Sequence, residues 1–143
     1  MKRFTLLFFM LFIPIMWGCN PNGSVTAPEG SEIVTDPTEY TFSDWSSGTV
    51  DQSQFMINVI VYDEKGKPQS GQELFFYCHL CDTGIVELHD NDGNLIDVSK
   101  GSVHGVTGDA GNYYLWVYFY SGSYLEYITD IRITSGANDA YVP

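Results

Sequence analysis

From about Tyr40 onward, the chain consists of short runs of aromatic and β-branched residues, separated by Gly, Asp and Asn. Within these runs the apolar side chains alternate with a period of two, and no window repeats them every 3.6 residues. A period of two is typical of strands that bury one face. The pattern therefore predicts an all-β domain with no helix of consequence.

Strands are expected wherever such a run lies between turn-forming residues. The runs cover residues 54–62, 73–80, 84–89, 95–98, 102–107, 112–120 and 127–134. Turn sequences such as Asp-Glu-Lys-Gly-Lys-Pro at 63–68 and Asp-Asn-Asp-Gly-Asn at 90–94 separate them. The crossover helices that a parallel sheet needs are missing. We expect a single antiparallel β-sandwich of about seven strands.

The run at 112–120, NYYLWVYFY, is the longest and the most aromatic. One face suits a core and carries Tyr113, Leu115, Val117 and Phe119. The other face is a row of large aromatic side chains: Tyr114, Trp116, Tyr118 and Tyr120. A strand of a sandwich usually exposes one face to solvent. This row is therefore predicted to be an exposed contact surface for a sugar, a protein or a neighbouring subunit. Alternatively, neighbouring strands or the segment with Tyr40, Phe42 and Trp45 cover it.

The N-terminal residues have the anatomy of a secretory signal peptide. Lys2 and Arg3 precede an apolar run of about a dozen residues, and Cys19 follows a glycine. A small residue before a cysteine at this place resembles the lipobox of bacterial lipoproteins. The resemblance implies a signal peptide at 1–18 and a lipidated Cys19. An ordinary secretory signal is the alternative, and the run is shorter than the ~20 residues of a membrane-spanning helix.

Residues 19–40 are rich in Pro, Gly, Ser, Thr and acidic residues, which predicts a flexible tether. The folded domain is then expected at 41–143. Beyond the signal peptide the basic residues are only Lys65, Lys67, Lys100 and Arg132. Set against eighteen acidic residues, they leave a formal charge of about −14, which disfavours nucleic acid and anionic lipid headgroups as partners.

Cys78 and Cys81 form a Cys-x-x-Cys pair. In an exported chain such a pair predicts a disulfide. A zinc site would need further ligands, for which the chain offers His79, His89 and His104. A metal site and free thiols are the alternatives, while a redox motif would need a βαβ context that is missing.

Catalytic and metal-binding motifs have little support. Placing Gly93 at the sixth position of an EF-hand loop puts Leu88 at the first, where an oxygen ligand is required, so a metal-free turn is expected. Gly-x-Ser-x-Gly, His-Glu-x-x-His and phosphate-loop motifs do not occur. We therefore expect a protein that is not an enzyme and holds no cofactor or metal.

Two sets of turn motifs point to a family. An apolar strand leads into Asp-x-x-Gly-x-Pro at 63–68, then Gly71 and a second alternating strand. Thr-Gly-Asp-Ala-Gly at 107–111 precedes the long aromatic strand, and Thr-Ser-Gly at 134–136 ends the last. Over about residues 50–136 the chain resembles group 1 bacterial immunoglobulin-like domains, the invasin and intimin type. Carboxypeptidase regulatory-like and transthyretin-like domains share the first hairpin and stay open as alternatives.

The resemblance implies an Ig-like sandwich that acts as a spacer or adhesive tip rather than as an enzyme. Combined with the leader, it predicts an outer-membrane lipoprotein, periplasmic or surface-facing, that binds a protein or glycan through the aromatic row. Asn20 in place of Asp behind Cys19 favours the outer membrane. The alternative is an accessory subunit of an envelope or filament assembly, open to self-assembly. The tail at 137–143 could add a strand to a neighbour or fray.

Overall fold

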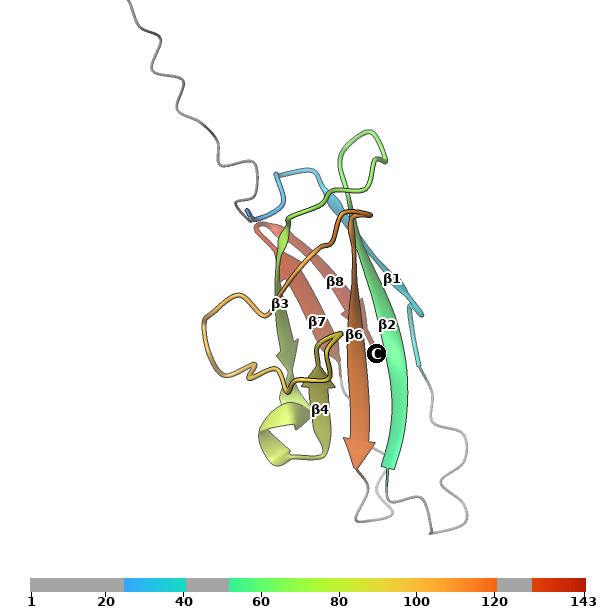
Figure 1. Ribbon diagram of the computed structural model, residues 1–143, viewed down its shortest axis with the longest axis vertical. Helices are drawn as coiled ribbons and strands as arrows, with labels where there is room; N and C mark the ends of the chain where they lie inside the picture. The colour runs from blue at the N-terminus through green and yellow to red at the C-terminus, as the bar shows by residue number, and fades with distance from the viewer. Residues whose placement is uncertain (1–24, 41–51, 121–129) are drawn as a thin grey trace, which may run out of the picture.

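The computed structural model describes residues 25–40, 52–120 and 130–143 and shows two packed β-sheets (Figure 1). The strand order is β1-β2-β6-β4 in the first sheet and β5-β3-β7-β8 in the second. Each strand pairs with its neighbours in antiparallel fashion. The predicted all-β antiparallel sandwich is therefore confirmed, with eight strands in the described part of the chain.

The first sheet is built from β1 (Glu32–Asp36), β2 (Gln52–Tyr62), β6 (Asn112–Tyr120) and β4 (Val86–His89). The second is built from β5 (Gly105–Val106), β3 (Glu73–Cys78), β7 (Ile131–Ser135) and β8 (Asn138–Val142). In immunoglobulin nomenclature the first order corresponds to A-B-E-D, and β3-β7-β8 corresponds to C-F-G. The two-residue β5 extends the second sheet beyond β3.

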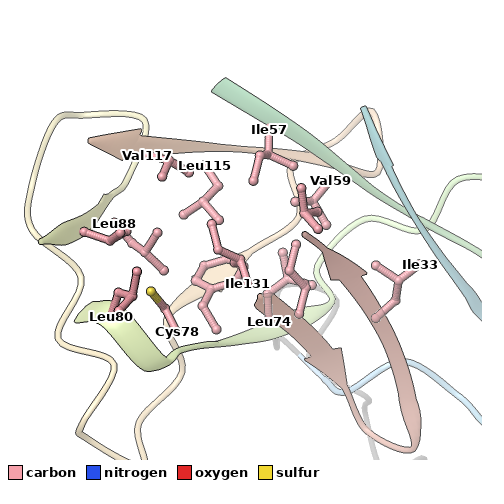
Figure 2. Packing of buried hydrophobic residues seen from close by; sticks show 14 of the residues in the cluster. Ile33, Ile57, Val59, Leu74, Cys78, Leu80, Leu88, Leu115, Val117 and Ile131 are labelled. Atoms are coloured by element: carbon pink, nitrogen blue, oxygen red, sulfur yellow. The ribbon is translucent and has the colours of Figure 1, made fainter. Parts of the chain in front are cut away.

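The core lies between the sheets and follows the period-two pattern of the strands. Ile57 and Val59 of β2 and Leu115 of β6 point inward from the first sheet, opposite Leu74 and Ile131 of the second (Figure 2). Burying one such side chain on folding stabilises the folded state by about 1.5–3 kcal/mol. The face of 112–120 that the sequence predicts to suit a core is the one that the structure buries at Leu115, Val117 and Phe119, with Tyr113 partly buried.

The N-terminal boundary of the domain differs from the prediction. Strand β1 pairs along its whole length with β2. Before it, the Val25 N–H donates to the Gly71 carbonyl (2.9 Å), and the Glu73 N–H donates to the Val25 carbonyl (2.8 Å). The Ala27 N–H donates to the buried Ser135 Oγ (2.9 Å). A tether that extends to residue 40 is therefore wrong, and the sandwich includes the chain from Val25; residues 19–24 lie outside the described residues.

The C-terminal segment also differs from the prediction. Residues 138–142 form β8, which pairs with β7 of the same chain rather than fraying. The connecting loop is the two residues Gly136 and Ala137, and only Gly136 has a positive φ (63°). This is the pattern of a type II′ hairpin turn, which matches the twist of the two strands. The predicted frayed tail is therefore wrong.

The predicted strands at 73–80, 95–98 and 102–107 differ most from the structure. The second predicted strand ends at Cys78 because residues 79–83 form a short 3-10 helix, η2 (His79–Thr83). The strand at 102–107 shrinks to β5. The strand predicted at 95–98 is wrong: Leu95 makes one isolated bridge to His89. The Asp97 carboxylate accepts hydrogen bonds from the N–H and hydroxyl of Ser99, and this turn ends the extended conformation.

The predicted signal peptide at 1–18 and the lipidation site Cys19 lie outside the described residues. The same holds for residues 127–129 of the last predicted strand. Within the described ranges, no helix is long and apolar enough to cross a membrane.

Candidate functional site

The four aromatic residues singled out in the sequence lie on the outward face of β6. Their odd-numbered neighbours Leu115, Val117 and Phe119 are buried in the core. Tyr114 is 37% exposed. The other three are partly exposed, so the outward side chains Tyr114, Trp116, Tyr118 and Tyr120 form a surface row. We call these four residues the β6 aromatic row.

Neighbouring strands cover the β6 aromatic row in part. Trp116 stands opposite Met56 of β2 and His89 of β4. Tyr118 stands between Gln54 and Glu87 in the same way. Directly opposed side chains on one face of a sheet are about 4.5–5.5 Å apart at Cβ, close enough to pack. The row is therefore flanked by apolar, polar and charged side chains and stays accessible to solvent.

A polar network holds one end of the row. The Tyr120 hydroxyl donates to Glu87 Oε2 (3.0 Å), and His89 Nε2 lies 3.0 Å from the same oxygen. On its other side His89 Nδ1 lies 3.0 Å from the Gly93 carbonyl. The imidazole also packs on Tyr118, with 4.5 Å between the ring centroids. These contacts restrict the rotamers of Tyr118 and Tyr120.

The same network perturbs the Tyr120 phenol. Burial, followed by the hydrogen bond to Glu87 and the charge of that carboxylate, raises the pKa of Tyr120. The phenol therefore keeps its proton and stays a hydrogen-bond donor to Glu87 at neutral pH.

Tyr40 does not lie over the β6 aromatic row. Its ring stacks on Phe55, with 3.9 Å between centroids and 3° between the ring planes. Phe55 points to the core side of β2, where it packs against the buried cluster. The Tyr40 N–H donates to the Pro143 carbonyl (3.2 Å). Tyr40 thus closes one end of the sandwich; Phe42 and Trp45, the other proposed covering residues, lie outside the described residues.

Cys78 and Cys81 are joined by a disulfide, as the sequence predicts. The bond staples the end of β3 to η2, with 5.4 Å between the two Cα atoms. His89 is engaged in the network above. His104 Nδ1 accepts the Phe76 N–H (2.8 Å), while its Nε2 lies 2.9 Å from the Lys100 carbonyl. The ring nitrogens of both histidines therefore bond to protein groups.

The acidic loop at 90–94 is a turn organised by Asp90. Asp90 Oδ1 accepts hydrogen bonds from the N–H groups of Asp92 and Asn94 (2.9 and 2.8 Å). Burial would raise the pKa of Asp90, but the hydrogen bonds from Asn94 and Asp92 outweigh it, and the pKa is lowered. Among the described residues, no three His, Cys, Asp or Glu side chains cluster as metal ligands would.

Sequence reasoning missed one surface feature. Tyr77 of β3, Arg132 of β7 and Tyr141 of β8 stand in register on the outward face of the second sheet. We call these three residues the tyrosine–arginine row. They come from three strands, so no alternation within one strand could reveal the row. The only available signal is the outward position of Arg132 in the alternating run at 127–134.

Comparison with known proteins gives no further assignment, because no protein-family model and no curated protein matches this chain.

Proposed function

We propose that this chain is a non-enzymatic, surface-exposed lipoprotein whose Ig-like domain binds a protein or glycan partner through the β6 aromatic row. The observation that carries the proposal is the outward placement of Tyr114, Trp116, Tyr118 and Tyr120 on one strand. Tyr and Trp bury a large area with few rotatable bonds and keep a polar tip, which suits a contact surface.

The rest of the face supports this role. The backbone under the row is the longest pairing in the sandwich, nine residue pairs between β2 and β6. The network around Glu87 holds Tyr120 and His89 in place. A preorganised surface loses less side-chain entropy when a partner binds. Met56, which is 38% exposed beside Trp116, adds an adaptable apolar side chain.

The leader sequence supports the envelope location. A lipid on Cys19 would hold the chain at a bacterial membrane, and Asn20 favours the outer membrane. Because the sandwich includes Val25, only residues 19–24 separate the proposed anchor from the domain. Six extended residues span at most about 20 Å. The module would therefore work close to the membrane surface.

The first experiment compares purified full-length protein with its Trp116→Ser variant. Light scattering gives the oligomeric state, and binding is measured to immobilised fibronectin, laminin and an array of oligosaccharides. Val103→Ser is the matched control, since Val103 is 40% exposed and lies outside the strands of the sheet that carries β6. The proposal expects a folded monomer that binds at least one probe, with binding lost only in Trp116→Ser.

Other outcomes contradict the proposal in distinguishable ways. A defined oligomer that Trp116→Ser dissociates would make the chain an assembly subunit instead of a free binding module. A Trp116→Ser variant that unfolds would make the row a structural part of the sandwich. A monomer that binds no probe, or that binds equally well without Trp116, would remove the role of the row in recognition.

A further inference from the structure

The tyrosine–arginine row crosses three strands on the face opposite the β6 aromatic row. Tyr77 pairs with Arg132, and Arg132 pairs with Tyr141. Tyr77 is 50% exposed and Tyr141 is 53% exposed. Among the described aromatic residues, these two present the largest exposed fractions. The two rings therefore offer open surface on either side of a cation.

Arg132 organises both rings. Its guanidinium carbon lies 5.9 Å from the Tyr77 ring centroid and 5.7 Å from the Tyr141 ring centroid. Both distances lie within the ~6 Å range of a cation–π contact. Nη2 also donates to Asp139 Oδ2 (3.3 Å). The cation therefore contacts both rings, and its hydrogen bond to Asp139 uses one nitrogen of a group with five N–H donors.

The spacing of the row suits a ligand made of rings. Tyr77 and Tyr141 are two strands apart, roughly 9.5 Å at the backbone, twice the strand spacing. The π-face of an aromatic ring carries partial negative charge, which attracts the weakly positive C–H groups of a pyranose face. Between the rings, guanidinium N–H groups can donate to sugar hydroxyls while the Asp139 carboxylate accepts from them.

Charge decides which class of sugar fits. Asp139 balances the Arg132 cation, and the chain carries a formal charge of −12. A sulfated or uronic polymer would be repelled by that charge. The exposed large apolar side chains of this sheet are the two tyrosines and Val106 of the short edge strand β5, whereas a protein partner typically covers about 800 Å². A neutral ligand of two to four sugar units matches both the size and the charge of the row.

We propose that Tyr77, Arg132 and Tyr141, with Asp139 beside them, form a binding site for a neutral oligosaccharide. The two tyrosine rings stack on alternate sugar rings, and the Arg132–Asp139 pair bonds the hydroxyls between them. This site is separate from the β6 aromatic row and does not depend on the function proposed for it.

The test is calorimetric titration of purified full-length protein with cellohexaose, xylohexaose, mannohexaose and chitohexaose, with heparin as a polyanionic probe. We expect at least one neutral hexaose to bind. Tyr77→Ala and Tyr141→Ala should each raise the Kd for that hexaose by about tenfold or more, because each removes one central contact. Arg132→Lys keeps the charge but loses the planar donors, and a several-fold weakening is expected.

The controls separate the two faces. Val103→Ser changes an exposed side chain outside both rows and should leave hexaose binding unchanged. Trp116→Ser tests whether the hexaose binds at the opposite face instead. Circular dichroism checks that each variant is folded, and exposure of the tyrosines makes unfolding unexpected. The proposal is overturned if no neutral hexaose binds at millimolar concentration, if heparin alone binds, or if binding is lost in Trp116→Ser but kept in Tyr141→Ala.

Discussion

The two outer faces of the sandwich both display aromatic side chains, but they are built in different ways. On the first sheet, four aromatic residues follow one another along β6 and are partly covered by β2 and β4. On the second sheet, two tyrosines from different strands flank a cation and are about half exposed. Packing against β2 and β4 holds the side chains of the first face in place, whereas the two tyrosines of the second face are held chiefly by their contacts with Arg132.

The largest expected effect tests the inner and outer sides of β6. Leu115→Ala should lower the free energy of unfolding by about 2–5 kcal/mol, because it empties a fully buried site. Trp116→Ala changes the next residue but faces outward, and should cost less than half as much. Urea unfolding monitored by circular dichroism measures both. Equal costs would show that the β6 aromatic row is core rather than surface.

Gly111→Ala should distort the first face and spare the second. Gly111 has φ of 75°, and a Cβ there would lie 2.6 Å from Pro68 Cβ and 2.8 Å from the Gln69 nitrogen. We expect a loss of about 1–3 kcal/mol in the free energy of unfolding, because Gly111 directly precedes β6. Gly66→Ala is the matched control, with φ of 74° and nothing within 4 Å.

NMR chemical shifts show which residues the Gly111→Ala substitution perturbs. They should change along β6 but not at Tyr77, Arg132 and Tyr141. A cost no larger than that of Gly66→Ala, or shifts that spread to the second sheet, would contradict this separation of the two faces.

Alkaline unfolding separates inner from outer tyrosines. Burial, followed by the charges of Asp90 and Asp92, raises the pKa of Tyr113 to about 12 from an ordinary value of 10.0. Folding therefore favours the protonated phenol. The stability that results is fully present below pH 10 and is lost as the pH rises toward 12. Tyr113→Phe should flatten this loss in urea unfolding between pH 9 and 12.

Asp92→Asn provides the control for the alkaline experiment. It removes one of the charges that raise the Tyr113 pKa, so the loss of stability should begin at a similar pH but end earlier. An unchanged profile in both variants would mean that Tyr113 is not the titrating group.

The smallest effect compares one phenol from each face. Tyr120→Phe removes the hydrogen bond to Glu87 Oε2 and should cost about 0.5–1.5 kcal/mol in the free energy of unfolding. Tyr141→Phe should stay within about 0.5 kcal/mol, as exposed substitutions usually do. Thermal unfolding at matched pH resolves the difference. Equal costs would mean that the two faces contribute alike to stability.

The sequence predicts those parts of the fold that one strand encodes by itself. The alternation within 54–62 and 112–120 identifies β2 and β6, and for β6 it also assigns the inner face. The Cys-x-x-Cys spacing identifies the disulfide. In each case the signal lies within a few neighbouring residues, so knowledge of the rest of the fold is not needed.

The two terminal strands were not predictable in this way. The five residues of β1, Glu-Ile-Val-Thr-Asp, lie between Gly30 and Pro37 in a segment whose composition is that of a linker. The five residues of β8 begin with Asn and Asp, two residues that favour turns, and are too few to show a clear period of two. Both strands gain their hydrogen bonds from a neighbour, β2 or β7, so tertiary pairing overrides weak local propensity.

The two candidate sites also differ in whether a single strand encodes them. The β6 aromatic row was predictable because a period of two sorts consecutive residues onto two faces. The tyrosine–arginine row depends on how β3, β7 and β8 are aligned, over more than sixty residues of chain. Sequence patterns fix which face a residue takes on its own strand, but the register between strands follows from packing of the whole sandwich.

The parallel bridge between Val25 and Gln72 decides how the domain carries tension. A pull through the residues before Val25 acts on its hydrogen bonds to Gly71 and Glu73 in shear, so that both must rupture together. The loaded strand is β3, which also bears Tyr77. Mechanical load on a bound sugar would therefore pass to the N-terminal segment along a single strand, without peeling the sheets apart.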